Sequence, residues 1–259
     1  NVGELKLVGP RGPLASWTLP AHEDAGAVRF EAEVIDHAVL ADPPRFALLR
    51  ATGTRLQRRI HKVDESWIEM IDPTSGEQHA RFDVRMSPLA FDPTGNLLFG
   101  HDYDKLIVLD GAGRVRDLPV SAGLISFAAS GAFALAALGV PAAPAAGIEL
   151  RDDDVKIAWR RDHAGVLAAA VDGDGHRALA LVQASRDNPA RTLADIDLAT
   201  GAMTTVADDG GEKLGPRDDS FFRANRSLTT AVFSDAEGTL HVHTKGASRW
   251  TRGLTRLSH

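Results

Sequence analysis

A hairpin pattern recurs along most of this 259-residue chain. In each copy an apolar strand ends at a turn rich in Asp, Gly, Pro or Thr, and a second strand follows. Gly and Asp favour such turns because Gly tolerates a positive φ and Asp hydrogen-bonds to nearby backbone amides. The clearest copies are 68–82, 106–120 and 196–206, and weaker copies are 5–20, 148–160 and 240–251. A unit that recurs about every 40 to 60 residues predicts a repeat architecture.

A second unit lies between successive hairpins and consists of two apolar strands around a short turn. Its copies are 88–100, 124–138, 166–182 and 221–233, with a degenerate version at 28–50. Together the two units supply four strands per repeat. Four short strands, repeated with turn residues between them, are typical of β-propeller blades. The sequence therefore predicts an all-β fold of four-stranded blades.

Two turn sequences carry a resemblance to a known class. Asp92-Pro93-Thr94-Gly95 and the turn at 72–76 (DPTSG) resemble turns of β-propeller repeat proteins of the broad WD40 and YVTN kind. The resemblance covers nearly the whole chain, and it implies a fold without implying an activity.

The number of blades follows from counting the two units. Six outer hairpins are present but only five inner pairs, because the sequence opens directly on the hairpin at Leu5. We predict six blades in a single domain over 1–259, with five or seven blades as alternatives. Because a ring needs closure to avoid bare sheet edges, we expect the N-terminal strands to take part in it. Residues upstream in a longer precursor, or a partner chain, are the other sources of the missing strands.

The segment 118–148 is the one candidate for a membrane span, since it carries no charge over more than the ~20 residues that spanning requires. Gly131, Gly139, Pro141 and Pro144 interrupt it, and a helix would tolerate them poorly. We therefore expect the inner strands of a buried blade and no membrane insertion. No signal peptide opens the sequence, so the expected compartment is the cytoplasm, with a removed leader left open.

Charge and composition exclude several functions. The chain has 29 basic and 35 acidic residues, for a formal charge of −6, and no long basic block, which argues against nucleic-acid binding. It has no Cys, which excludes thiol nucleophiles and thiolate metal sites. The nucleophile elbow, the phosphate loop and the His-Glu-x-x-His motif are also absent. The sequence predicts no catalytic residue and no cofactor.

Binding residues are expected on the longer, charged connections, because long loops on one rim of a rigid scaffold are where binding usually resides. These connections are 51–66, 100–105, 139–147, 184–192 and 207–220. The first is strongly basic, which indicates a docking patch for an acidic partner or a phosphate, or else a charged edge strand that resists aggregation. The candidate partner-binding residues are Arg55, Arg58, Arg59, His61, Lys62, His101, Asp102, Asp104, Arg186, Asp187 and Asp218.

Three further patterns suggest chemistry without completing a site. His241 and His243 form a His-x-His pair but lack an evident third metal ligand. The turn Asp172-Gly173-Asp174-Gly175 begins like a calcium loop but lacks the distal Glu, so a tight turn is the simpler interpretation. His101 with Asp102 would suit an acid–base pair but lacks a nucleophile or a metal. We therefore predict no metal.

The function hypothesis is a non-catalytic scaffold or recognition subunit that binds a protein partner through its long-loop face, within a multi-protein complex. The alternative is a lactonase-like propeller hydrolase with a metal in its axial channel. A carbohydrate binder is disfavoured, because one Tyr and four Trp offer few aromatic platforms. For the tryptophans we expect packing between blades.

Overall fold

The computed structural model describes residues 4–9, 12–18, 27–56, 59–102, 104–151, 154–183, 185–187, 191–208, 222–234, 240–244 and 251–252. The regular structure of these residues is all β, and none of them belongs to a helix long and apolar enough to cross a membrane. The chain divides into two compact units, unit 1 (Asn1–Asp117) and unit 2 (Leu118–His259). Each unit is described by itself.

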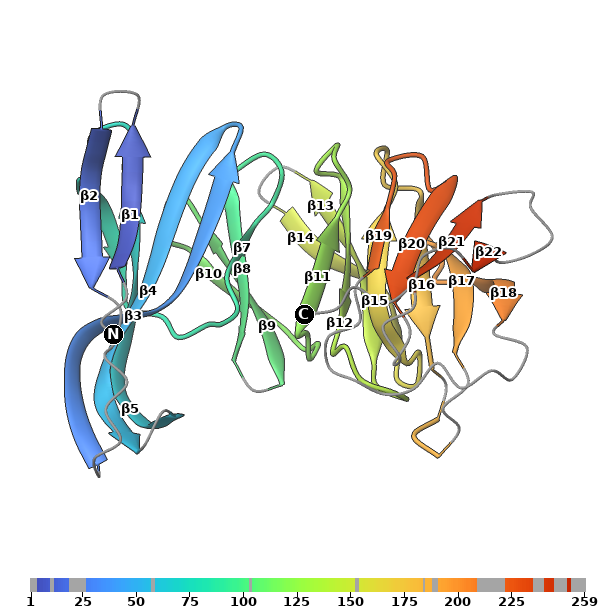
Figure 1. The fold of residues 1–259 in the computed structure, drawn as a ribbon, viewed down its shortest axis with the longest axis horizontal. Helices are drawn as coiled ribbons and strands as arrows, with labels where there is room; N and C mark the ends of the chain where they lie inside the picture. Colours follow the sequence, from blue (N-terminus) through green and yellow to red (C-terminus); the bar gives the residue numbers. More distant parts are fainter. Residues whose placement is uncertain are drawn as a thin grey trace. The chain divides into compact units, whose positions relative to one another are not determined.

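Unit 1 contains a two-stranded hairpin and two four-stranded sheets, whose strands lie in chain order (Figure 1). The hairpin is β1 (Glu4–Gly9) with β2 (Gly12–Thr18). The first sheet is β3 (Ala27–Ala41), β4 (Pro44–Leu56), β5 (Arg59–Ile71) and β6 (Gln78–Phe82). The second sheet is β7 (Ala90–Phe91), β8 (Leu97–Asp102), β9 (Lys105–Asp110) and β10 (Val115–Leu118), which ends at the boundary between the units.

Unit 2 contains three four-stranded sheets of the same order. The first is β11 (Leu124–Phe127), β12 (Phe133–Ala137), β13 (Ala145–Arg151) and β14 (Asp154–Arg161). The second is β15 (Val166–Val171), β16 (Arg177–Val182), β17 (Thr192–Asp197) and β18 (Met203–Asp208). The third is β19 (Phe222–Ala224), β20 (Thr230–Ser234), β21 (Leu240–Thr244) and β22 (Thr251–Arg252).

The predicted repeat is confirmed strand by strand. All six outer hairpins form, and all five inner pairs precede a hairpin in the same sheet, including the degenerate pair, which is β3 with β4. The uncharged segment at 118–148 contains β11, β12 and the start of β13, so the strand prediction is confirmed there.

An aspartate begins many of the turns and explains why the repeat is visible in the sequence. Asp72 Oδ1 accepts the backbone amides of Thr74 (2.6 Å) and Ser75 (3.2 Å). Asp110 Oδ1 accepts those of Ala112 (3.0 Å) and Arg114 (2.9 Å). Asp92, Asp172 and Asp197 make equivalent bonds in their own turns. Each carboxylate satisfies amides that the turn removes from the sheet ladder.

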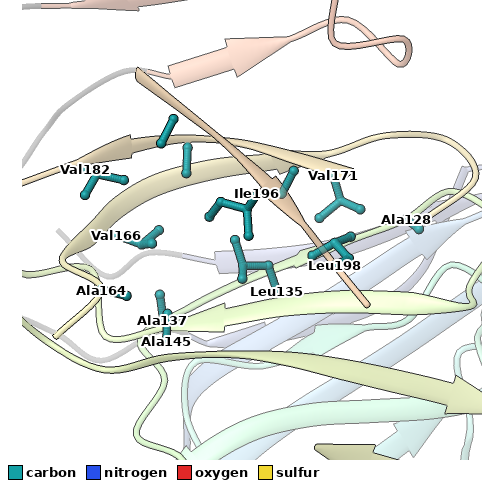
Figure 2. Close-up of a cluster of buried hydrophobic side chains, with 13 residues drawn as sticks. Ala128, Leu135, Ala137, Ala145, Ala164, Val166, Val171, Val182, Ile196 and Leu198 are labelled. Atoms are coloured by element: carbon teal, nitrogen blue, oxygen red, sulfur yellow. The ribbon is translucent and has the colours of Figure 1, made fainter. Parts of the chain in front are cut away.

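The largest core of unit 2 lies between the sheet β11–β14 and the sheet β15–β18. Figure 2 shows these side chains, which are mostly alanines and valines around Leu135, Ile196 and Leu198. Strand β12 is buried along most of its length, which explains why its sequence lacks the apolar–polar alternation of a half-exposed strand. Small side chains on facing strands let two sheets pack closely without voids.

Unit 1 has two cores, one on each side of its first sheet. Leu49 and Ile68 pack in one cluster with Met86, which precedes the second sheet, and with Phe91, Leu98 and Leu109 of that sheet. On the opposite side, the hairpin β1–β2 covers the sheet, with Leu5, Leu7 and Trp17 packed against Val34, Phe46, Leu48 and Ile71. The rings of Trp17 and Phe46 meet edge to face, with centroids 5.3 Å apart.

Of the other described tryptophans, Trp159 contacts a neighbouring sheet, as predicted, whereas Trp67 contacts Glu69 and Arg81 of its own sheet. Trp159 Nε1 donates to the carbonyl of Leu198 at 2.8 Å, which ties β14 to the neighbouring sheet. Trp67 is buried, donates to Glu69 Oε1 at 2.9 Å, and carries the Arg81 guanidinium 4.2 Å above its ring. Trp250 lies outside the described residues.

Candidate partner-binding surfaces

The long-loop end of each sheet is the end that carries the connection between its second and third strands. In these antiparallel sheets the link to the next sheet leaves from the same end, whereas the two short turns lie at the other end. The candidate residues predicted from sequence belong to this end, so the following surfaces are described sheet by sheet.

The first sheet of unit 1 extends well beyond its fourth strand at the long-loop end. Strands β3, β4 and β5 run for 15, 13 and 13 residues, whereas β6 pairs only with Ile68–Ile71 of β5. Figure 1 shows these three as the longest strands of unit 1. We call the part formed by 27–33, 51–56 and 59–66 the β3–β5 extension.

The extension corrects one sequence prediction. The segment 51–66 is not a loop, because β4 pairs with β5 as far as Leu56 and Arg59. The alternative interpretation of this segment as a charged strand fits better, because alternate positions of β4 are buried there, at Ala51, Gly53 and Arg55. The predicted long connection at 100–105 is likewise short, since β8 and β9 pair up to Asp102 and Lys105.

A bulge in β3 anchors the extension to the rest of its sheet. Pairing with β4 shifts between Phe30 and Glu33, and Ala32 has a φ of 53°. Arg50 Nε donates to the carbonyl of Ala32 at 2.7 Å, and its Nη1 lies 3.4 Å from Glu69 Oε2. The guanidinium therefore satisfies a carbonyl that the bulge leaves out of the ladder.

Arg55 has a role inside the extension. Its side chain is only 10% exposed, its Nη2 lies 2.6 Å from Glu33 Oε2, and its guanidinium carbon is 5.4 Å from the centre of the Phe30 ring. Gly53 permits this packing, because a Cβ there would lie 2.1 Å from the carbonyl oxygen of Lys62 and 3.0 Å from the Phe30 ring. Arg55 is thus a buried ion-pair partner that holds β3 against β4.

The other basic candidates of this segment lie toward its tip. Lys62 is exposed and bonds Asp64 Oδ1 at 2.6 Å, and this hydrogen bond holds the pKa of Asp64 below its usual value. Arg58 lies outside the described residues, as do the side chains of Arg59 and His61, although their backbones belong to β5.

Exposed apolar side chains at the tip are the feature that the sequence analysis missed. Val28 is 46% exposed, Leu56 46% and Ile60 41%. Val28 and Ile60 both lie opposite Arg55 in the ladder, on one face of the extension, and Leu56 lies on the other. The signal was available in the alternation of apolar and charged residues along 27–33, which typifies a strand with one covered face.

The His101 cluster at the long-loop end of the second sheet is a set of structural contacts. His101 Nδ1 contacts the carbonyl oxygen of Ser87, and the Ser87 amide donates to the carbonyl of His101 at 2.9 Å. Burial lowers the pKa of His101, against the opposing effect of the Asp102 charge. Asp102 lies 3.7 Å from Arg85 Nε, so the histidine and the carboxylate face different partners. Asp104 is exposed.

In unit 2, Arg186 and Asp187 are exposed on the connection between β16 and β17. The base of this connection is fixed by backbone bonds from Gln183 to Gly165 (2.9 Å) and from Ala142 to Gln183 (3.1 Å). Two long-loop connections and a link between sheets therefore meet around Gln183. Asp218 lies outside the described residues.

Of the two sequence patterns that suggested a metal, one forms a turn and the other is only partly described. Asp172 Oδ1 accepts the amides of Gly175 (2.7 Å) and His176 (2.8 Å), which is the tight turn expected. His243 is buried, which lowers its pKa, and the side chain of His241 is outside the described part. In the portion of the chain that the structure describes, no three His, Asp or Glu side chains gather as metal ligands would.

Comparison with known proteins bears on the fold. No family model matches the sequence, and no curated protein matches it either. Among solved structures, the chain is similar to a eukaryotic initiation factor (11% identity, TM-score 0.55, covering 98% of this chain and 62% of that one). It is similar to Sqt1 of Chaetomium thermophilum, with 12% identity and a TM-score of 0.54, over 85% of this chain and 59% of Sqt1. It is also similar to the β-propeller domain of Cps50 (Swd1) from Myceliophteria thermophila, with 11% identity and a TM-score of 0.50, over 87% of this chain and 88% of that domain.

These likenesses define the class of protein. The chain has a β-propeller repeat fold, as its turn sequences predicted. It spans less than two thirds of Sqt1 and of the initiation factor, and identities of 11% to 12% show the fold alone.

Proposed function

We propose that this chain is a non-catalytic β-propeller scaffold that binds a protein partner through the long-loop ends of its sheets. The observation that supports this most directly is the β3–β5 extension, where Val28, Leu56 and Ile60 are exposed among charged residues. Apolar anchors inside a polar rim are the usual composition of a protein interface. Exposed apolar side chains at a protruding tip suit a partner with a small apolar groove.

The charged residues around these apolar side chains are better suited to orienting a bound partner than to attracting it. Lys62 is bonded to Asp64, and Arg55 to Glu33, so two of the basic side chains already have acidic neighbours. We therefore propose that the partner presents a mixed polar rim, with Arg58, Arg59, His61 and Lys62 selecting its acidic positions. Arg186 and Asp187 would add contacts from unit 2, and His101, Asp102 and Asp104 from the second sheet of unit 1.

The proposed architecture is one six-bladed domain in which the hairpin β1–β2 is the outer half of the sixth blade and takes part in ring closure. Support comes from the five four-stranded sheets and one hairpin among the described strands. A compact chain of this length has a radius of gyration of about 18 Å. Small-angle X-ray scattering that gives this value agrees with a closed ring, and a clearly larger value contradicts it.

The partner proposal is tested by affinity purification of the tagged protein from its source cells, followed by mass spectrometry. We expect a stoichiometric partner that the double variant Leu56→Glu/Ile60→Glu loses. The matched control is Val115→Glu/Val206→Glu, which changes two valines that are also exposed, on the fourth strands β10 and β18. This control should keep the partner.

Two outcomes would contradict the proposal. One is recovery of the chain alone under conditions that preserve weak complexes. The other is a partner that both double variants retain, which would place the interface elsewhere. Circular dichroism of each variant shows whether a lost partner reflects the surface or a lost fold, because all four substituted side chains are exposed.

A further inference from the structure

The β3–β5 extension loses the support of a fourth strand at its base. The last pair between β5 and β6 is Ile68 with Phe82, and from there β3, β4 and β5 continue toward the tip. A narrow sheet twists more readily than a wide one, because fewer ladder bonds oppose the twist. The direction in which the tip points therefore depends on the contacts at its base.

A continuous line of polar contacts crosses this base from β6 to β3. The guanidinium carbon of Arg81 on β6 lies 4.2 Å from the centre of the Trp67 ring on β5, and Trp67 Nε1 donates to Glu69 Oε1 at 2.9 Å. Arg50 Nη1 on β4 lies 3.4 Å from Glu69 Oε2, and Arg50 Nε donates to the Ala32 carbonyl of β3 at 2.7 Å. We call these four side chains and this carbonyl the polar belt.

The register places the polar belt where the four-stranded sheet becomes the extension. Glu69 lies opposite Arg81 in the ladder of β5 with β6, next to the last pair of that ladder. Trp67 lies opposite Arg50 in the ladder of β4 with β5, just beyond the end of β6. On β3 the belt ends at Ala32, inside the bulge. The belt thus joins all four strands on one face, at the level where one of them stops.

Glu69 is the buried centre of the polar belt, with a side chain that is 8% exposed. Asp92 and Asp110, which are also buried, accept amides of their own turns. Glu69 instead accepts from a tryptophan on its own strand and an arginine on the next. A buried ion pair adds little stability over apolar residues, but separating it is costly because an unpaired charge remains buried. A network of this kind favours one arrangement of the strands that carry it.

We propose that the polar belt is a conformational device that fixes the direction of the extension. It holds the exposed apolar side chains of the tip, Val28, Leu56 and Ile60, in place before a partner binds. Glu69 is then a positioning residue, which acts through Arg50 on the bulge. Side chains held in place in advance lose less conformational entropy on binding, so they bind more tightly. The device does not depend on the proposed function, whereas its effect on binding rests on that function.

Hydrogen exchange of the full chain, read by mass spectrometry, tests the device. Glu69→Ala should speed exchange of the amides in 51–56 and 59–66 by about tenfold or more, because the base of the extension loses its restraint. Amides of the second sheet, β7 to β10, should exchange at an unchanged rate. Glu69→Gln keeps an acceptor for Trp67 and Arg50 and should retain most of the protection. Arg50→Gln, at a less buried position, should reproduce the effect of Glu69→Ala.

Leu48→Ala is the matched control for a general loss of stability. Leu48 is fully buried opposite Glu69, on the same face, and takes no part in the polar belt. This variant should not single out the extension. Three results would overturn the proposal: faster exchange in the extension and the second sheet alike, no change in either, or the same selective effect from Leu48→Ala.

A binding measurement separates the device from the proposed function. Glu69→Ala should release the copurified partner about tenfold faster than the unsubstituted protein, although the tip side chains are unchanged. Equal release rates together with faster exchange would overturn the effect of the belt on binding. Recovery of no partner would contradict the proposed function, and hydrogen exchange would still decide whether the belt fixes the extension.

Discussion

The first sheet of unit 1 and the second sheet of unit 2 share one strand order but differ in strand length and in the side chains that they bury. Strands β15 to β18 have 6 residues each, and their buried positions are mostly Ala, Val and Leu. Strands β3 to β5 are about twice as long and bury an arginine, Arg55, and a glutamate, Glu69. Strand order follows from the turns, whereas strand length and side-chain chemistry vary freely from blade to blade.

Burial explains why the two sheets differ in composition. The inner strands of β15–β18 are packed on both sides by neighbouring sheets of unit 2, which favours small apolar residues. The β3–β5 extension passes beyond β6, so its two faces have fewer neighbours and its own side chains must cover one another. An ion pair stacked on Phe30 achieves this cover without exposing a large apolar surface.

Core truncations should have the largest effect and should test whether the two units fold together. Leu135→Ala in unit 2 and Leu49→Ala in unit 1 each remove a fully buried side chain. Each should destabilise the protein by about 2–5 kcal/mol, from lost burial and a residual cavity. Because we propose one domain, both variants should lower the midpoint of the same single unfolding transition, measured by calorimetry. Two transitions, each moved by one variant, would contradict a single domain.

Removing the acidic partner of Arg55 should come next. Glu33→Ala leaves a largely buried guanidinium without the carboxylate 2.6 Å away, which costs about 2–3 kcal/mol. Urea denaturation measures the loss. The double variant Glu33→Ala/Arg55→Met should recover part of it, because no charge is then left buried. A double variant whose loss equals the sum of the losses in Glu33→Ala and in Arg55→Met alone would show that the pair is not coupled.

A methyl group at Gly53 should have a smaller effect, limited to the extension. Its Cβ would collide with the carbonyl oxygen of Lys62, so β5 must shift, and we expect Gly53→Ala to cost about 1–2 kcal/mol. Gly111→Ala is the matched control, because nothing lies within 4 Å of a Cβ there. Gly53→Ala should unfold at a lower temperature than Gly111→Ala. Equal unfolding temperatures would mean that β5 shifts at no measurable cost.

The smallest effect should be a loss of stability in mild acid. Burial lowers the pKa of both His101 and His243 from the usual value of 6.5, partly offset at His101 by Asp102. Because these histidines have a higher pKa in the unfolded chain, the unfolded chain binds protons first as the pH falls. The free energy of unfolding therefore keeps its full value above pH 6.5 and decreases as the pH falls below it. Unfolding in urea at about pH 7.5 and about pH 5.5 should show the loss, and His101→Gln/His243→Gln should reduce it.

Much of the fold could be predicted from local sequence, and less of the candidate site. The turns were predictable because Asp72, Asp110 and Asp197 bond amides only two to four residues away, which is a local interaction. The extension was not, because burial of Arg55 depends on Glu33 and Phe30 on another strand. Of the arginines predicted to bind a partner, Arg55 therefore stabilises the extension instead.

The sequence by itself determined the all-β repeat, the positions of the six outer hairpins and the apolar character of the inner strands, because turn chemistry and strand burial depend on neighbouring residues. Only the tertiary structure decided that 51–66 is a hairpin and that Val28, Leu56 and Ile60 stay exposed. It also decided that β1 pairs only with β2 among the described strands. Exposure depends on what other strands cover, and strand cover is set by contacts between residues far apart in the chain.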